Sequence, residues 1–210
     1  MNLDARPWIA AVILSLLALS PEEAHAGMTD SEVKAFESYK AKAEKGDRVA
    51  QFNLGLSYAN GEGVAKDLVQ AVSWYRKAAE QGDAKAQFNL GYCFENGEGV
   101  TQDFVQATSW WRKAAEQGDA LAQFNLGVVY EHGRGVIKNE IEAYAFYNLA
   151  GITEESARKQ LASLEERLSP DARLLGQQRT IQLQKEIEGR LETAQDLLDA
   201  IRKEKMREGI

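Results

Sequence analysis

The order of small, apolar and polar residues repeats every 36 positions in the middle of this chain. Three copies occupy residues 43–78, 79–114 and 115–150, and each begins with the pattern A-E-x-G-D-x-x-A-Q-F-N-L-G. An aromatic residue, G-x-G-V, an alanine and an aromatic pair follow in the same order. Self-similarity at such a period is typical of stacked repeats. We therefore expect an array, which presents a long surface to partners and rarely encloses a catalytic pocket.

Each copy is predicted to fold as a helix, a loop and a second helix. In the first copy, Ala50, Leu54 and Tyr58 recur at helical spacing after Asp47, which suits an N-cap. Gly55 beside this stripe predicts a close approach of two backbones. The loop carries two glycines two positions apart, which suit a turn with positive φ. It lacks the Lys-Ser/Thr pair and the preceding strand of a phosphate-binding loop.

The second helix of each copy has its own start signal and apolar stripe. Asp67 followed by Gln70 predicts a capping box, and the two later copies repeat this spacing. Aromatic residues at helical spacing beside alanines are typical of a core rather than of a nucleic-acid stacking surface. The stripe residues are Ala71, Trp74, Tyr75, Ala78, Ala107, Trp110, Trp111, Ala114, Ala143, Phe146, Tyr147 and Ala150.

Taken together, the motifs L-G-x-x-Y, G-x-G-V and W-Y-x-K-A-A resemble the Sel-one-like repeat, a relative of the tetratricopeptide repeat. The resemblance covers residues 43–150 in three copies. It implies an all-α fold, an α/α superhelical solenoid of helix-turn-helix repeats, that acts as an adaptor between proteins. One branch of the family has a disulfide in every repeat, whereas this chain has the single cysteine Cys93.

Both ends of the array are expected to carry capping helices, because open arrays need them. Residues 27–42 are predicted to form the N-terminal cap, with a capping box at residues 29–32. Residues 151–210 are predicted to form a C-terminal cap and a long helix that starts at Ser169-Pro170. In the long helix, Leu191, Ala194, Leu198 and Ile201 resemble a short heptad seam. The helix either packs back on the array, projects alone or pairs with another copy; we expect a monomer.

Residues 1–26 have the features of a secretory signal peptide. A short region with Arg6 precedes an apolar run over residues 8–19 and an A-H-A site at residues 24–26. Cleavage would leave no stable membrane span, although Asp4 leaves an uncleaved anchor as an alternative. We expect an exported protein, periplasmic or else secreted.

Composition narrows the chemistry that the chain can support. The formal charge is −7, or −5 without residues 1–26, which argues against a nucleic-acid partner. Cys93 and His132 lie on different repeats and cannot make a conventional metal site, so we expect no metal, cofactor or small-molecule substrate. Cys93 is interpreted as a small core residue or, alternatively, as a site of intermolecular pairing.

The candidate binding surface follows from comparing the three copies. On the first helix, residues shared by the copies fall on one side, and most differences fall on the opposite side. In tetratricopeptide relatives the matching stripe lines the concave groove. The alternative is that its phenylalanines pack between repeats. The predicted partner-binding residues are Val49, Phe52, Leu56, Lys85, Phe88, Tyr92, Glu95, Leu121, Phe124, Val128 and Glu131.

These observations favour a non-catalytic protein–protein interaction adaptor or scaffold in the bacterial cell envelope. Three other functions stay open: an assembly protein that works through its C-terminal helix, a secreted effector, and a cell-wall hydrolase with paired carboxylates. No nucleophile motif such as G-x-S-x-G is present, and the repeated carboxylates have a structural role as helix caps.

Overall fold

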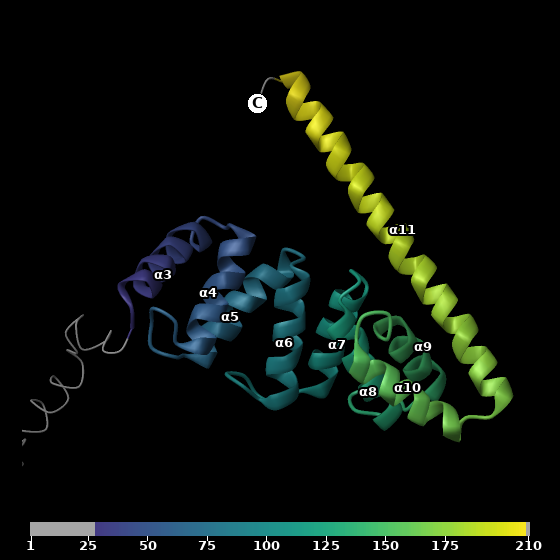
Figure 1. Cartoon of the computed structure of the whole chain (residues 1–210). Helices are drawn as coiled ribbons and strands as arrows, with labels where there is room; N and C mark the ends of the chain where they lie inside the picture. The colour runs from purple at the N-terminus through teal and green to yellow at the C-terminus, as the bar shows by residue number, and fades with distance from the viewer. Residues whose placement is uncertain (1–27, 209–210) are drawn as a thin grey trace, which may run out of the picture.

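The computed structural model describes residues 28–208, and within this range the chain forms helices without a strand (Figure 1). The all-α prediction is therefore confirmed for this part of the chain. The predicted signal peptide, residues 1–26, lies outside it. In chain order the helices are α3 (Asp30–Ala43), α4 (Arg48–Asn60), α5 (Leu68–Glu80), α6 (Ala84–Asn96), α7 (Phe104–Ala115), α8 (Ala120–His132), α9 (Glu140–Ala150), α10 (Glu155–Arg167) and α11 (Pro170–Glu208).

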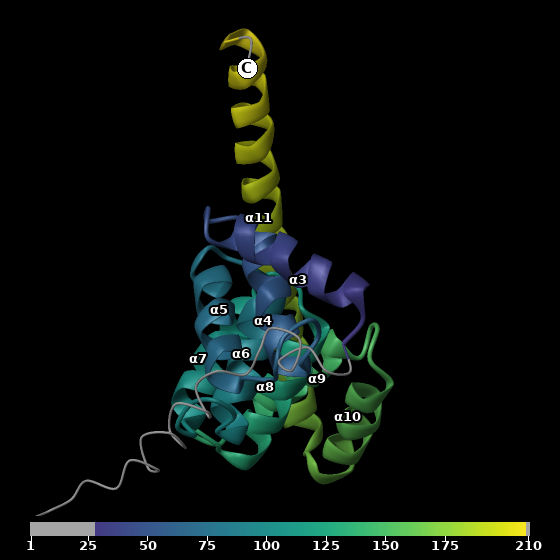
Figure 2. The same cartoon turned by 90° about the vertical axis from the view of Figure 1, so that its left-hand side faces the viewer.

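Each sequence repeat folds into one helical hairpin. The first helices are α4, α6 and α8, and the second helices are α5, α7 and α9. Each second helix packs on the first helix of its own repeat and, for α5 and α7, on the first helix of the next repeat. The hairpins thus follow one another in a row (Figure 1), and Figure 2 views this row from its α3 end. This is the predicted α/α solenoid, in which each repeat contacts its neighbours only.

A glycine in each first helix receives an aromatic ring from the second helix of the same repeat. A Cβ added to Gly91 would lie 2.6 Å from ring atoms of Trp111, which is fully buried. The Trp111 indole N–H donates to the Phe88 carbonyl at 3.2 Å. The predicted close approach of two backbones is also present, because the added Cβ would lie 3.1 Å from the Ala107 carbonyl oxygen; the ring is the nearer contact, which the sequence did not indicate. Gly55 with Tyr75 and Gly127 with Tyr147 repeat this contact.

The N-caps form as predicted, but the capping boxes of the second helices do not. The Asp67 carboxylate accepts from the backbone N–H groups of Val69 and Gln70. The Asp67 N–H, which Gln70 would have to bind in a capping box, donates instead to the Tyr58 carbonyl at 2.9 Å. The prediction of a capping box was therefore wrong here, because the first helix already supplies the acceptor. Asp103 and Asn139 donate to Phe94 and Tyr130 in the same way.

A buried glutamine in each first helix connects consecutive elements. The Gln87 amide donates to the Ala79 carbonyl in α5 at 3.0 Å, and its oxygen accepts from Gln117 at 2.8 Å. Gln51 likewise donates to Ala43 and accepts from Gln81. Buried polar groups are stable only when paired, so these amides favour one relative placement of neighbouring helices.

The predicted front cap forms as helix α3. Thr29 and Glu32 make both halves of a capping box at its start. The buried Phe36 ring lies edge-on to Tyr58, with ring centroids 5.5 Å apart. Gly63 in the first loop has φ +71°, and an added Cβ would lie 2.2 Å from the Glu32 carbonyl oxygen. The loop can therefore approach α3 this closely only with a glycine.

At the other end of the array, helices α10 and α11 both pack on α9. Ser169 caps α11 through a hydrogen bond from the Ala172 N–H at 3.2 Å, as predicted. A Cβ added to Gly176 would lie 2.5 Å from the Tyr144 ring, so α11 approaches α9 closely at this point. Further along the helix, Leu183 is buried against the array.

The third repeat carries substitutions where α11 docks. Leu149 in α9 replaces Lys77 and Lys113 of the sister repeats, and those lysines lie over the rings of Trp74 and Trp110. The buried Ala145 likewise replaces two exposed serines. Exchange of charged and polar side chains for apolar ones creates the surface that α11 covers. Arg190 still binds Glu116, and the C-terminal part of α11 stands away from the array (Figure 1), so this helix both packs back and projects.

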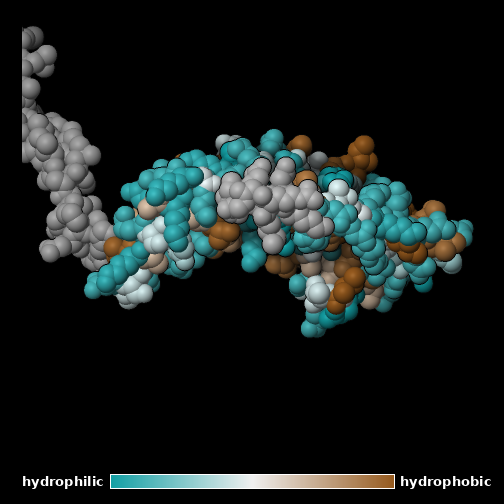
Figure 3. Space-filling view, turned by 90° about the horizontal axis from the view of Figure 1, so that it is seen from above, coloured by the Kyte–Doolittle hydropathy of each residue, from teal (hydrophilic) through white to brown (hydrophobic). Residues whose placement is uncertain are grey.

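The helices between residues 28 and 208 include none that is long and apolar enough to span a membrane. Figure 3, which looks down on the array, shows a mostly hydrophilic face on which the hydrophobic residues form separate patches.

Candidate functional site

A hollow lies between the first helices α4 and α6. Leu56 and Ala59 of α4 line one side, and Asn89 and Tyr92 of α6 line the other; together they enclose about 300 Å³. We call this hollow the α4–α6 groove. Ala71 and Tyr75 of α5, both buried, form its floor. The other residues that line it are Asn60, Lys66, Leu68, Cys93 and Glu98.

The floor of the α4–α6 groove is uncharged at neutral pH. Burial raises the pKa of Tyr75 to about 12, although a hydrogen bond with Asn89 opposes this shift. Burial also raises the pKa of the Cys93 thiol to about 11. Both side chains are therefore protonated and suit an apolar group rather than an ion. Cys93 is 6% exposed, which favours the small core residue over the intermolecular disulfide considered from the sequence.

Two of the predicted residues, Leu56 and Tyr92, lie in the α4–α6 groove. Leu56 is half-buried, whereas 46% of Tyr92 is exposed. The sister position of Tyr92 in the third repeat is Val128. The fold therefore accepts an aliphatic residue here, and the exposed Tyr92 ring is free to contact another molecule.

The predicted row of phenylalanines packs within the repeats. Phe52 lies with its ring centroid 6.0 Å from that of Tyr75, and Phe124 lies 5.9 Å from Tyr147. Phe88 is half-buried too, and its carbonyl accepts the Trp111 indole N–H. The ring contacts of Phe52 and Phe124 thus lie within one repeat, whereas the alternative raised from the sequence placed them between repeats, and each ring is half-buried.

Three predicted residues lie near the start of the first helices. Val49, Lys85 and Leu121 are exposed, and none of them lines the α4–α6 groove. They remain proposed contacts for a partner that extends past the groove.

Helix α10 occupies the surface that the third repeat would otherwise offer. Glu131 accepts from the Tyr147 hydroxyl at 2.7 Å and makes an ion pair with Arg167 of α10. Phe124 and Val128 pack against the cluster that contains Leu164 of α10. Burial alone would raise the pKa of Glu131, but the hydrogen bonds from Tyr147 and Arg167 outweigh burial and lower it. These three predicted residues already have partners within the chain.

Glu95, the remaining predicted residue, lies between the second and third repeats. Burial raises the pKa of its carboxyl, and the charge of Arg134 acts in the opposite direction. The Glu95 carbonyl accepts from the Gln102 amide at 2.7 Å. Of the predicted residues, Leu56 and Tyr92 thus share one hollow, the α4–α6 groove.

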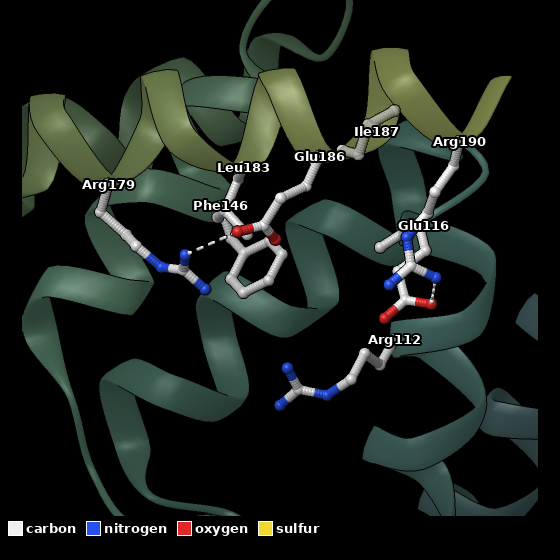
Figure 4. Close-up of a pocket in the computed structure, with 9 residues that line it drawn as sticks. Arg112, Glu116, Phe146, Arg179, Leu183, Glu186, Ile187 and Arg190 are labelled. Atoms are coloured by element: carbon white, nitrogen blue, oxygen red, sulfur yellow. Dashed lines mark hydrogen bonds and ion pairs between the residues drawn. The ribbon is translucent and has the colours of Figure 1, made fainter. Parts of the chain in front are cut away.

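The sequence left open whether the last helix packs back on the array, and the structure places it against α7 and α9, as Figure 4 shows in close-up. A cavity of about 50 Å³ lies there between Phe146, Leu183 and several charged side chains. The Arg179 Nε lies 2.7 Å from a Glu142 oxygen, and Arg190 binds Glu116 at 2.8 Å. The cavity is too small for more than a few water molecules, so we interpret it as an imperfection of a docking interface.

Within residues 28–208, no three His, Cys, Asp or Glu side chains gather into a group that could hold a metal ion. His132, at the end of α8, has its Nδ1 atom 2.9 Å from the Val128 carbonyl oxygen.

Comparison with solved structures finds repeat proteins of the same architecture. A Sel1 repeat protein from Oxalobacter formigenes is 36% identical with a TM-score of 0.62; the match covers 71% of this chain and 64% of that one. The chain therefore spans less than two thirds of that protein's length. Helicobacter pylori cysteine rich protein B is 26% identical with a TM-score of 0.51, over 64% of this chain and 98% of that one. Comparison with curated proteins found no match.

The family model named Sel1 repeat matches residues 48–83, 84–119 and 120–151. These units begin a few residues later than the copies defined from the sequence, but each contains one first helix and one second helix. With three consecutive repeats and the helical architecture of its structural neighbours, the chain belongs to the Sel1 repeat family.

Proposed function

We propose that this protein is a non-catalytic adaptor in the bacterial cell envelope, and that its α4–α6 groove holds a segment of another exported protein. Sel1 repeats generally serve as scaffolds for protein–protein interaction, which supports the adaptor part of the proposal. The groove and the envelope location are our own inferences. The envelope location depends on the signal peptide predicted for residues 1–26.

The exposed Tyr92 beside the neutral floor of the groove carries the proposal. Aromatic side chains in partly enclosed sites usually contribute most of an interface's energy. Tyr92 has an apolar ring with Leu56 across the groove, and the Asn89 amide beside it can donate and accept hydrogen bonds. This combination suits a peptide segment that places an apolar side chain on the floor and its polar backbone against the amide.

The rim of the groove limits which segments fit. Lys66 lies in the loop between α4 and α5, and Glu98 lies in the loop between α6 and α7. Both line the hollow, and their side chains carry opposite charges. A partner segment with an acidic and a basic residue on the two sides of its apolar anchor would match this rim. We expect the exposed Lys85 to contribute to charge recognition next to the groove.

Site-specific photo-crosslinking would test the proposal. A photoreactive phenylalanine analogue in place of Tyr92 should capture a specific exported protein in cells. Val105 is the matched control position, because it is 63% exposed on the second helix α7 and does not line the groove. Both substituted chains should fold alike, which circular dichroism would verify.

A partner captured from position 92 and absent from position 105 would support the groove. Equal capture at both positions, or capture only at position 105, would contradict it. Retention of residues 1–26 on the mature protein in a cytoplasmic fraction would contradict the envelope location without bearing on the groove.

A further inference from the structure

A second hollow lies where the start of α8 and the end of α9 meet α11. It encloses about 210 Å³, and we call it the α8–α11 hollow. Leu149 and Ile187 supply apolar walls, and Ile187 also lines the smaller cavity of Figure 4. Gly118, Gln123 and Thr153 supply polar groups. The hollow is thus separate from the α4–α6 groove and combines apolar walls with hydrogen-bonding groups.

The first two hairpins show which group fills the corresponding place. Gln81 follows α5, and its side-chain amide donates to the Gln51 side-chain oxygen at 2.7 Å and to the Gly46 carbonyl at 3.1 Å. In the second hairpin, the Gln117 amide donates to the Gln87 oxygen at 2.8 Å. In both hairpins, a carboxamide that follows the second helix therefore bonds to the buried glutamine of the first helix.

The third hairpin has a threonine where the first two have this glutamine. Thr153 stands 36 residues after Gln117. Its backbone N–H donates to the Ala150 carbonyl at 3.1 Å, and the Gln81 N–H donates to the Ala78 carbonyl at the same distance. Residue 153 therefore occupies the same place along the backbone, and only its side chain, which lacks the carboxamide, differs.

The acceptors that match those of the first hairpin are the Gln123 side-chain oxygen and the Gly118 carbonyl. Gln123 is 6% exposed, and its amide N–H donates to the Ala115 carbonyl at 3.3 Å. Among residues 28–208, however, no group donates to the Gln123 side-chain oxygen or to the Gly118 carbonyl. A buried acceptor without a donor costs free energy, so a ligand that supplies the donor is favoured here.

Helix α11 borders the hollow but does not supply the missing donor. The Gln184 side-chain amide donates to Glu188 at 2.9 Å, within α11. The same bond engages the Glu188 carboxylate, the acidic group that lines the hollow. An ammonium ligand would have to compete for this carboxylate, and burial beside Gln123 would penalise its charge. A neutral donor therefore fits the hollow better.

We propose that the α8–α11 hollow binds the side-chain carboxamide of a glutamine on a partner protein. Its two N–H groups would donate to the Gln123 oxygen and the Gly118 carbonyl, as in the first hairpin. Its methylene groups would contact Leu149 and Ile187. Ile152 lines the hollow too and is 73% exposed, so it offers an apolar contact to the polypeptide that carries the glutamine. The proposal does not depend on the function of the α4–α6 groove.

Titration of the isotope-labelled exported chain, followed by nuclear magnetic resonance, tests the proposal. The probe is N-acetyl-glutamine N-methylamide, and its matched control is N-acetyl-methionine N-methylamide, whose side chain has a similar length but no N–H. The glutamine probe should cause saturable shifts of the Gly118 and Thr153 backbone amides and of the Gln123 side-chain amide. The methionine probe should bind at least about tenfold more weakly, because it leaves both acceptors without a donor.

Substitutions at Thr153 test the site itself. Thr153→Gln places the protein's own carboxamide in the hollow, so it should weaken binding of the glutamine probe at least about tenfold and raise the thermal midpoint. Thr153→Val is the matched control, because it leaves both acceptors uncovered and should bind the probe as wild type does. An absence of saturable shifts, equal affinity for the two probes, or unchanged binding by Thr153→Gln would overturn the proposal. Tighter binding of free L-glutamine than of the capped probe would overturn the assignment to a protein side chain.

Discussion

Gly91→Ala tests whether the contact between a first-helix glycine and a second-helix ring defines the repeat. Helix propensity alone predicts a gain of about 1 kcal/mol, because alanine is the better helix former. The structure predicts the opposite result. The new methyl carbon would lie 2.6 Å from Cδ1 and Nε1 of Trp111, which is too close for any carbon contact.

Trp111 can yield to the new methyl group only by shifting a buried ring. It is fully buried, and its indole N–H is bonded to the Phe88 carbonyl. Overpacking costs about 1–3 kcal/mol. If the ring shifts and loses its acceptor, the buried N–H adds about 1–3 kcal/mol. After the gain in propensity, we expect the free energy of unfolding to fall by about 3 kcal/mol.

Urea unfolding followed in parallel by tryptophan fluorescence and circular dichroism would measure this change. Both signals are needed, because a repeat array can lose its cooperativity when one unit is weakened. Gly189→Ala is the matched control, since Gly189 is helical and has no atom within 4 Å of an added Cβ. The control should not lower stability. A Gly91→Ala protein as stable as wild type would refute the packing argument.

Three further predictions concern titratable groups and α10. Because burial raises the pKa of Cys93 to about 11, iodoacetamide at pH 8 should label the native protein far more slowly than the urea-unfolded protein; equal rates would contradict its burial. The pKa of Glu131 is lowered from its usual 4.5, so its contribution to stability is present above about pH 4.5 and is lost as pH falls through the folded pKa. The stability of Glu131→Gln should therefore fall less steeply than that of wild type as the pH is lowered. Thermal melts at pH 3–7 would detect this difference. Tyr147→Phe, which removes the hydroxyl bound to Glu131, should speed hydrogen exchange in α8 to α10 but not in α3, and uniform exchange rates would argue against a local role.

The repeat architecture could be predicted because local signals agree in all three copies. Asp47 and its two counterparts cap the first helices, and the recurring glycines and aromatic residues mark the interior of each hairpin. The capping box at Asp67 could not be judged from the sequence. Its outcome depended on the Tyr58 carbonyl, which reaches the Asp67 N–H only after the two helices have packed.

The binding surface could be predicted only in part, because the ends of the array lack the repeat pattern. Comparison of the copies singled out Leu56 and Tyr92, which line one groove, and their contact with a partner stays a prediction. It could not show that α10 covers Val128 and Glu131, since the position of α10 follows from tertiary packing. The docking site of α11 did have a signal, namely Leu149 in place of the two sister lysines.

The central claim is that the α4–α6 groove binds a partner through Tyr92, and the affinity of Tyr92→Ala for the crosslinked partner tests it most directly. Titration calorimetry with the purified partner would give the dissociation constants of wild type, Tyr92→Ala and the control Val105→Ala. Tyr92→Ala should lose about 1–3 kcal/mol of binding free energy, which raises the dissociation constant roughly 5- to 150-fold. Its thermal stability should stay near that of wild type. Val105→Ala should bind as wild type does. A Tyr92→Ala protein that binds with unchanged affinity would contradict the account.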